Sequence, residues 1–91
     1  MKVCYIAKVT GVVQGVYFRA SAQNIAIDHA LSGYAHNLED GSVEVMVCGD
    51  EGNVQHMLDW LQQGPDEAEV ENVTVDQTHP RDINHFSKDD K

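Results

Sequence analysis

Apolar residues follow two different periods in the first third of this chain. They take every second position from Val3 to Val9, which predicts a β-strand with one buried face. A loop over residues 11–15, with a glycine at each end, follows that strand. From Phe18 onward the apolar residues recur at helical spacing, and they predict a helix that ends near residues 31–33.

The next segment has the pattern of a β-hairpin. Residues 34–38 form one expected strand, and valines at every second position from Val43 to Val47 form the other. The Asp-Gly step between them is typical of a tight hairpin turn, because glycine tolerates positive φ. The chain breaks again at residues 49–52, where glycine and acidic residues gather.

The remaining third predicts a second helix and a final strand. Apolar residues at helical spacing from Val54 to Leu61 predict an amphipathic helix beside the first, which the Gly-Pro step at residues 64–65 ends. Valines within residues 70–75 predict a strand with irregular alternation. Residues 80–91 are mostly polar and charged, and we expect them to be frayed.

These elements follow the order β-α-β-β-α-β. That order predicts a ferredoxin-like α+β sandwich, with a four-stranded antiparallel sheet and two helices on one face of it. Right-handed crossovers place the first strand inside the sheet, antiparallel to the third, so Cys4 and Cys48 become possible neighbours. We expect the two to stay separate thiols, because disulfides rarely persist in the cytosol.

Length and charge narrow the class of protein. A chain of 91 residues is expected to form a single domain, residues 1–91. The net charge of −9 argues against nucleic acid and anionic membranes as partners, since both need a basic surface. No apolar run is long enough to span a membrane, and Lys8 interrupts the N-terminal apolar stretch. With no evident apolar patch to cover, we expect a cytoplasmic monomer that acts on a small molecule.

Residues 9–19 read V-T-G-V-V-Q-G-V-Y-F-R and have the features of an anion site. Glycines let backbone N–H groups approach a ligand closely, and Arg19 adds planar donors suited to phosphate oxygens. A cation at the start of a helix is unfavourable unless an anion binds there. Arg19 is also the only lysine or arginine between Lys8 and Arg81. The chain therefore offers a dianion few other places to bind.

Asn37 supplies the second candidate group, at the end of the second expected strand. An amide is a poor base, but it can orient a water by accepting and donating hydrogen bonds at once. Positioning alone suffices where the leaving group needs no proton, as in mixed anhydrides of carboxylic and phosphoric acids. Acyl phosphates are therefore better candidate substrates than phosphate monoesters.

The two segments together resemble the signatures of the acylphosphatase family. Residues 11–19 match G-x-V-Q-G-V-x-F-R at every fixed position, and residues 33–43 match G-[WY]-x-x-N-x-x-[DN]-G-x-V. The similarity extends over nearly the whole chain. It implies a small ferredoxin-like enzyme that hydrolyses acyl phosphates to a carboxylate and orthophosphate, without a metal or other cofactor.

The resemblance also implies roles for individual residues. Arg19 and the loop amides would hold the phosphoryl group, and Asn37 would orient the attacking water, so Arg19 and Asn37 would form the catalytic pair. The acyl group is left open, with acetyl, carbamoyl and glyceroyl phosphates as candidates. The loop amides are those of Gln14, Gly15, Val16, Tyr17 and Phe18.

The chain departs from the family pattern in two places. Ala30 stands where the family usually has a glycine after the first helix, and if φ is positive there, alanine costs about 1 kcal/mol. The family commonly closes with an aromatic residue, a β-branched residue and an arginine in a short strand, whereas Ser87 and Lys88 follow Phe86 here. We therefore expect that strand to be frayed or absent.

Other patterns favour no separate site. The five histidines lack metal-ligand spacing, and the Gly-rich loop lacks the G-K-[ST] of a nucleotide-binding loop. Paired carboxylates lie in expected turns and loops, where a solvated acidic surface is the simplest interpretation. The main alternative is a noncatalytic anion-binding module of the same fold, since fold does not determine function. A domain of a larger carbamoyl-processing enzyme is another, which the short chain disfavours.

Overall fold

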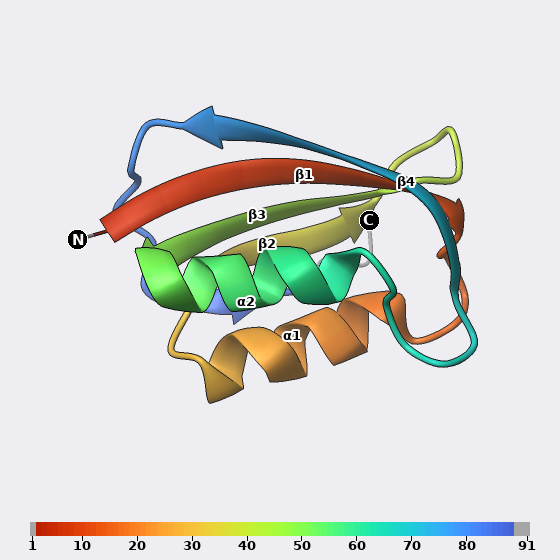
Figure 1. The fold of residues 1–91 in the computed structure, drawn as a ribbon, viewed down its shortest axis with the longest axis horizontal. Coiled ribbons are helices and arrows are strands. Elements are labelled where there is room, and N and C mark those ends of the chain that lie inside the picture. The colour runs from red at the N-terminus through yellow and green to blue at the C-terminus, as the bar shows by residue number, and fades with distance from the viewer. Residues whose placement is uncertain (1, 89–91) are drawn as a thin grey trace.

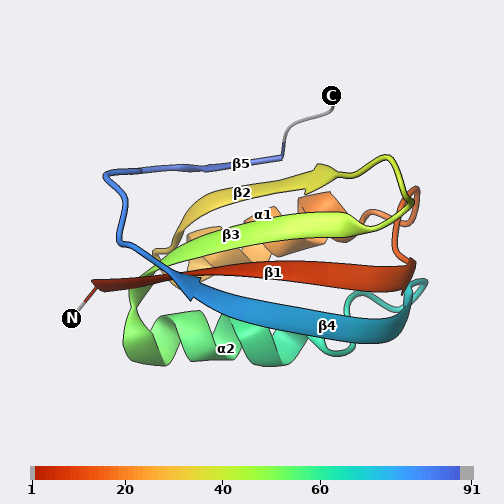
Figure 2. The ribbon, with the colours of Figure 1, turned by 90° about the horizontal axis from the view of Figure 1, so that it is seen from above.

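A computed structural model describes residues 2–88 and shows two layers, a sheet and a pair of helices on one face of it (Figures 1 and 2). The sheet order is β4-β1-β3-β2-β5, with β1 inside as predicted. The ferredoxin-like α+β prediction is therefore confirmed. The elements are β1 (Lys2–Val12), α1 (Phe18–Asp28), β2 (Ser32–Asn37), β3 (Val43–Asp50), α2 (Glu51–Leu61), β4 (Glu69–Thr78) and β5 (Phe86–Ser87).

The sheet has one strand more than the four antiparallel strands predicted. β5 pairs in parallel with β2, where Gly33 faces Phe86, and the Gly33 N–H donates to the His85 carbonyl at 2.9 Å. The expectation that this last strand is frayed or absent was wrong, because Phe86 is buried and anchors it in the core. The part of that expectation that concerns residues 89–91 falls outside the described residues.

The helix boundaries differ from the prediction by a few residues. α1 ends at Asp28 rather than near residues 31–33, because Ala30 has a left-handed φ of 56° that ends the helical path. α2 begins at Glu51, inside the expected break at residues 49–52. Helix ends depend on local backbone conformation more than on the apolar period, so the pattern located both helices but missed the end of α1 and the start of α2.

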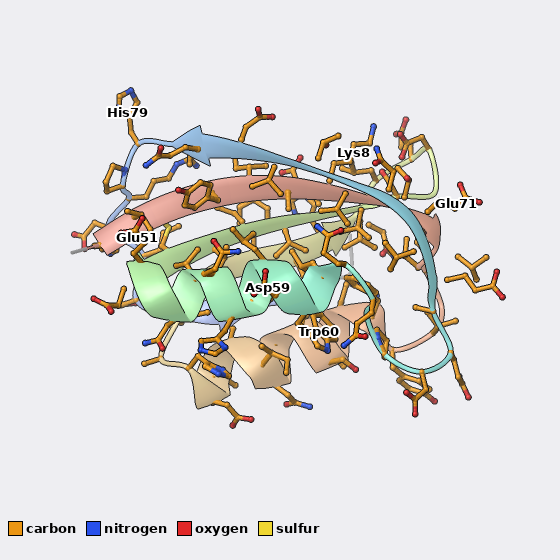
Figure 3. The ribbon with its side chains drawn as sticks, viewed as in Figure 1. Lys8, Glu51, Asp59, Trp60, Glu71 and His79 are labelled. Carbon is orange, nitrogen blue, oxygen red and sulfur yellow. A yellow bond between two sulfur atoms is a disulfide. The ribbon has the colours of Figure 1, made fainter. Side chains whose placement is uncertain are left out.

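The main core lies between the sheet and the helices. The ring of Phe18, at the first position of α1, lies 5.4 Å from that of Trp60 on α2, centroid to centroid. Figure 3 shows Trp60 on the side of α2 that faces α1. Because Phe18 is almost completely buried, it holds the start of α1 against the core. Other fully buried side chains are Val9, Val45, Val54, Met57 and Leu61.

Gly11 lies within β1 and not in the predicted loop. The register of β1 against β4 shifts between Thr10 and Gly11, which is a β-bulge. A Cβ on Gly11 would lie 2.1 Å from the Glu69 carbonyl oxygen, so only glycine allows this close approach. The bulge also explains the irregular valine spacing of β4. Of the two glycines assigned to the anion loop, only Gly15 belongs to it.

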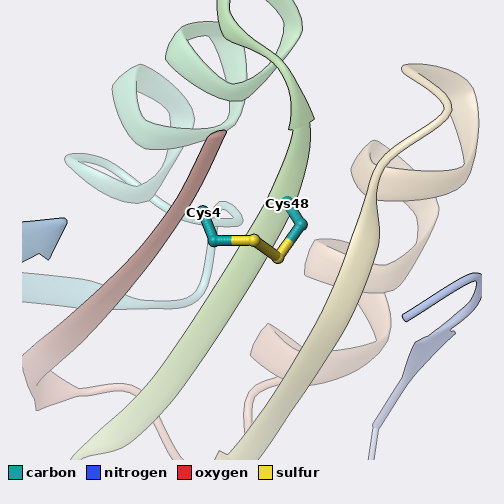
Figure 4. Close-up of a disulfide and its surroundings, with 2 residues drawn as sticks. All are labelled: Cys4 and Cys48. Atoms are coloured by element: carbon teal, nitrogen blue, oxygen red, sulfur yellow. A yellow bond between two sulfur atoms is a disulfide. The ribbon is translucent and has the colours of Figure 1, made fainter. Parts of the chain in front are cut away.

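Cys4 and Cys48 form a disulfide between β1 and β3 (Figure 4). The prediction that they lie close together is confirmed, but the expectation of two separate thiols was wrong. They are directly opposite in the antiparallel register, with their Cα atoms 4.1 Å apart. Both are completely buried, in a small cluster with Met46 and Ile83 that is separate from the main core.

Candidate active site

The loop after β1 and the turn after β2 lie at the same end of the sheet (Figure 2). The Gln14 side chain joins them, because its Nε2 donates to the carbonyls of Leu38 and Ser42, each at 2.9 Å. Leu38 directly follows Asn37 in the chain. The sequence indicated Gln14 for its backbone amide, and the structure adds a role for its side chain in connecting the two segments.

The turn after β2 is held by Asp40. Its carboxylate accepts a hydrogen bond from Lys8 Nζ at 2.8 Å, from the Ser42 N–H at 3.0 Å and from the Ser42 hydroxyl. The bond from Lys8, followed by those from Ser42, holds the pKa of Asp40 well below its usual range. Asp40 was expected to be part of a solvated acidic surface, but it also stabilises the turn beside Asn37.

The loop reaches α1 through left-handed backbone. Gly15 has a φ of 75° and Tyr17, directly before the helix, has a φ of 61°. The N-cap residue, Tyr17, makes no side-chain capping hydrogen bond, and the first turn of α1 contains no acidic residue. The first N–H groups of a helix have no acceptor within the helix, and together with the helix dipole they favour an anion. The local backbone geometry therefore favours an anion at this helix terminus.

A cavity of about 330 Å³ lies at this helix terminus. Arg19 lines it, as the sequence predicts, together with three of the five predicted loop residues. Gln14, Val16 and Asn37 are not among its lining residues, whereas Lys88, which neither sequence motif contains, is one of them. The complete lining is Val13, Gly15, Tyr17, Phe18, Arg19, Ala20 and Lys88.

Asn37 is the last residue of β2 and partly buried. Its Oδ1 atom is buried and has no hydrogen-bond partner among residues 2–88. The neighbouring His36 belongs to a different group of side chains, since its ring stacks on Tyr34 at 4.6 Å and its Nε2 lies 3.6 Å from Glu44. This agrees with the expectation that adjacent strand residues face opposite sides of the sheet.

Two histidines that are far apart in sequence meet in the structure. His29 at the end of α1 and His56 on α2 stack with ring centroids 5.2 Å apart. Within residues 2–88, however, His, Cys, Asp and Glu side chains form no group of three or more that could hold a metal ion. No helix in this part of the chain has both the length and the apolar character needed to cross a membrane.

Comparison with known proteins identifies the family. The acylphosphatase family model matches residues 5–88. This chain belongs to the acylphosphatase family. The acylphosphatase of Colwellia psychrerythraea is 54% identical over 86 residues, which are 94% of this chain and 96% of that protein. The acylphosphatase of Photobacterium profundum is 45% identical over 85 residues, or 93% of this chain and 94% of that protein.

Solved structures agree with the family assignment. The structure of an acylphosphatase from Coxiella burnetii matches with a TM-score of 0.93 and 34% identity, and the match covers 97% of this chain and 93% of that one. The resemblance noted in the two short motifs is thus confirmed over nearly the full length of the chain.

Proposed function

We propose that this protein hydrolyses acyl phosphates to a carboxylate and orthophosphate. The observation that carries the proposal is the cavity at the N-terminus of α1, which Gly15 and Arg19 line, connected through Gln14 to the turn that follows Asn37. The family membership of the chain supports the same reaction. In this proposal, Arg19 and the loop amides of residues 14–18 hold the phosphoryl group, and Asn37 orients the water.

The phosphoryl group needs donors that are already in place. In phosphoryl transfer, charge is spread over the equatorial oxygens of a loose transition state, and preformed donors stabilise it most effectively. Backbone N–H groups at a helix N-terminus and the planar guanidinium of Arg19 are donors of this kind. The buried Phe18 keeps the start of α1, and with it Arg19, in a fixed position.

Asn37 orients the water without removing its proton. Its Oδ1 is free to accept a hydrogen bond from the water, because no described residue donates to it. The water oxygen forms a bond to phosphorus while the bond from phosphorus to the acyl oxygen breaks. The electron pair of that bond leaves with the carboxylate, and the water protons stay with the orthophosphate or pass to solvent. No general acid is required, since a carboxylate is a good leaving group.

The test is the rate at which the EDTA-treated protein hydrolyses benzoyl phosphate, with inorganic phosphate as a competitor. Loss of a single preorganised donor typically lowers kcat by roughly 10² to 10³. We expect Arg19→Gln to lose both turnover and phosphate inhibition. The matched control is Arg81→Gln, which removes an exposed arginine that does not line the cavity and should leave both unchanged.

Asn37→Ala separates positioning of the water from binding of the phosphoryl group. We expect it to lose turnover while phosphate still binds with nearly the wild-type affinity, and the exposed Asn72→Ala to behave as wild type. Equal loss of phosphate affinity in the Arg19 and Asn37 variants would contradict this division of roles. Phosphate binding without turnover in the wild-type protein would instead favour the noncatalytic anion-binding module.

The compartment and the oligomeric state are proposed separately. The charge and the apolar pattern favour a cytoplasmic monomer, whereas the Cys4–Cys48 disulfide is typical of oxidising compartments. Trapping of free thiols in freshly lysed cells distinguishes the reduced from the oxidised protein, and light scattering of the purified chain measures its mass in solution.

A further inference from the structure

Lys88 reaches the candidate active site from a part of the chain that neither sequence motif covers. The other residues that line the cavity lie between residues 13 and 20, in the loop and the first turn of α1. Lys88 directly follows β5 and is exposed. The cavity therefore has one wall made by the loop and α1, and a lysine on a separate wall.

The pairing of β5 explains why Lys88 arrives at this place. β5 runs parallel to β2, with Tyr34 opposite Ser87, and β2 continues to Asn37 at the candidate active site. Figure 2 shows both strands running toward the end of the sheet that carries the loop and the turn. Lys88 is the next residue in that direction. An antiparallel β5 would have placed it at the opposite end.

A hydrogen bond from α1 fixes the position of β5. Gln23 Nε2 donates to the Phe86 carbonyl at 2.9 Å. Arg19 lies one helical turn before Gln23, about 6 Å along the axis, and Lys88 lies two residues beyond Phe86, about 6.6 Å along the strand. Because α1 runs from the loop back toward the start of β2 (Figure 1), both steps lead to the same cavity.

The charge of Lys88 matters because the rest of the molecule is acidic. The net charge of −9 repels anionic substrates, most strongly those that carry charge beyond the phosphoryl group. Lys8 already forms an ion pair with Asp40 at 2.8 Å. A lysine is a mobile point charge on a flexible stem, which suits an extended ligand better than a fixed phosphoryl group.

We propose that Lys88 is a specificity residue that binds a negative charge on the acyl group of the substrate. The inference rests on the proposed function, since the phosphoryl group is taken to lie on the loop and Arg19. The part of the substrate beyond the phosphoryl group then meets the other wall. The preferred substrates are acyl phosphates whose acyl group is itself anionic because it carries a second carboxylate or phosphate.

The experiment compares two substrates that differ by one charge. Benzoyl phosphate and 4-carboxybenzoyl phosphate are hydrolysed by the wild-type protein, Lys88→Met and Lys88→Arg. We expect Lys88→Met to lower kcat/KM for the carboxylated substrate about threefold to fivefold more than for benzoyl phosphate, the range of an exposed ion pair. Lys88→Arg should retain the preference, and 0.5 M salt should reduce the difference.

The matched control is Lys2→Met, which removes an exposed lysine at the end of β1 far from the cavity. Its ratio of kcat/KM values for the two substrates should equal that of the wild type. An equal loss on both substrates, or none, would overturn the proposal. Binding of benzoylphosphonate and 4-carboxybenzoylphosphonate, measured by calorimetry, provides a readout without turnover. If the wild type binds both analogues but hydrolyses neither substrate, the proposed function fails while the Lys88 inference is still decided by the ratio of the two affinities.

Discussion

Ala30 shows how one backbone angle sets the cost of a side chain. Its φ of 56° lies in the left-handed region, where a Cβ contacts the following carbonyl oxygen. From the sequence, this cost applied only if φ at Ala30 is positive, because the family usually has glycine at that position. The structure meets that condition, so the energetic consequence can be stated for this chain.

We expect Ala30→Gly to stabilise the protein by about 1 kcal/mol, because relief of the left-handed strain exceeds the greater freedom of glycine in the unfolded chain. Chemical denaturation at fixed pH measures the change in the free energy of unfolding. Ala22→Gly, inside α1, is the opposing control and should destabilise by about 1 kcal/mol or more. Loss of stability in both variants would show that Ala30 is not strained.

At the scale of elements, the candidate site depends on two connections that are far apart in sequence. Gln14 joins the loop after β1 to the turn after β2, and Asp40 joins that turn to Lys8 on β1. Figure 3 shows Lys8 near this turn. The groups proposed to bind the phosphoryl group and those proposed to orient the water sit on different segments. Their separation is therefore set by these contacts.

Gln14→Ala should reduce catalysis more than it reduces stability. It removes two hydrogen bonds, each worth about 1 kcal/mol, and lets the loop move relative to Asn37. Because misplacement by about 1 Å can cost on the order of 10²-fold in rate, we expect kcat for benzoyl phosphate to fall at least tenfold. Exposed Gln77→Ala serves as the control. Wild-type kcat in Gln14→Ala would show that the connection does not position the catalytic groups.

At the scale of the whole molecule, the disulfide and the candidate active site lie at opposite ends of β1. Cys4 is near the start of that strand, and the loop that holds Gly15 follows its end. From Cys4 to Val12, the last residue of β1, the strand spans about 26 Å. Stability and catalysis should therefore respond differently to loss of the bridge.

We expect reduction of the disulfide to lower the melting temperature by about 10–20 °C, because a bridge that closes a loop of 44 residues contributes up to about 4 kcal/mol. Hydrolysis of benzoyl phosphate at 25 °C should be nearly unchanged. Thermal unfolding with and without reductant measures this change. The Cys4→Ala, Cys48→Ala double variant should have the melting temperature of the reduced protein, and reductant should not change it. A parallel loss of activity well below the melting temperature would contradict the separation.

The sequence by itself determined the order of the first six elements and the residues proposed to hold the phosphoryl group and the water. Strand alternation, helical spacing and glycine turns are local properties, so they can be recognised in short segments such as residues 34–47. The two motifs also name Arg19 and Asn37 without any tertiary structure. Local patterns could not assign Gly11 correctly, since its role depends on the close approach of Glu69 from another strand.

The topology inferred from the sequence made Cys4 and Cys48 possible neighbours, but only the tertiary structure decided that they are bonded and that Lys88 lies beside Arg19. Cys4 and Cys48 are joined because strand register places them opposite each other, and register is set by packing across the whole sheet. Lys88 reaches the cavity beside Arg19 because a two-residue strand pairs in parallel with β2. Such contacts join residues 44 or more positions apart, so no local period in the sequence reports them.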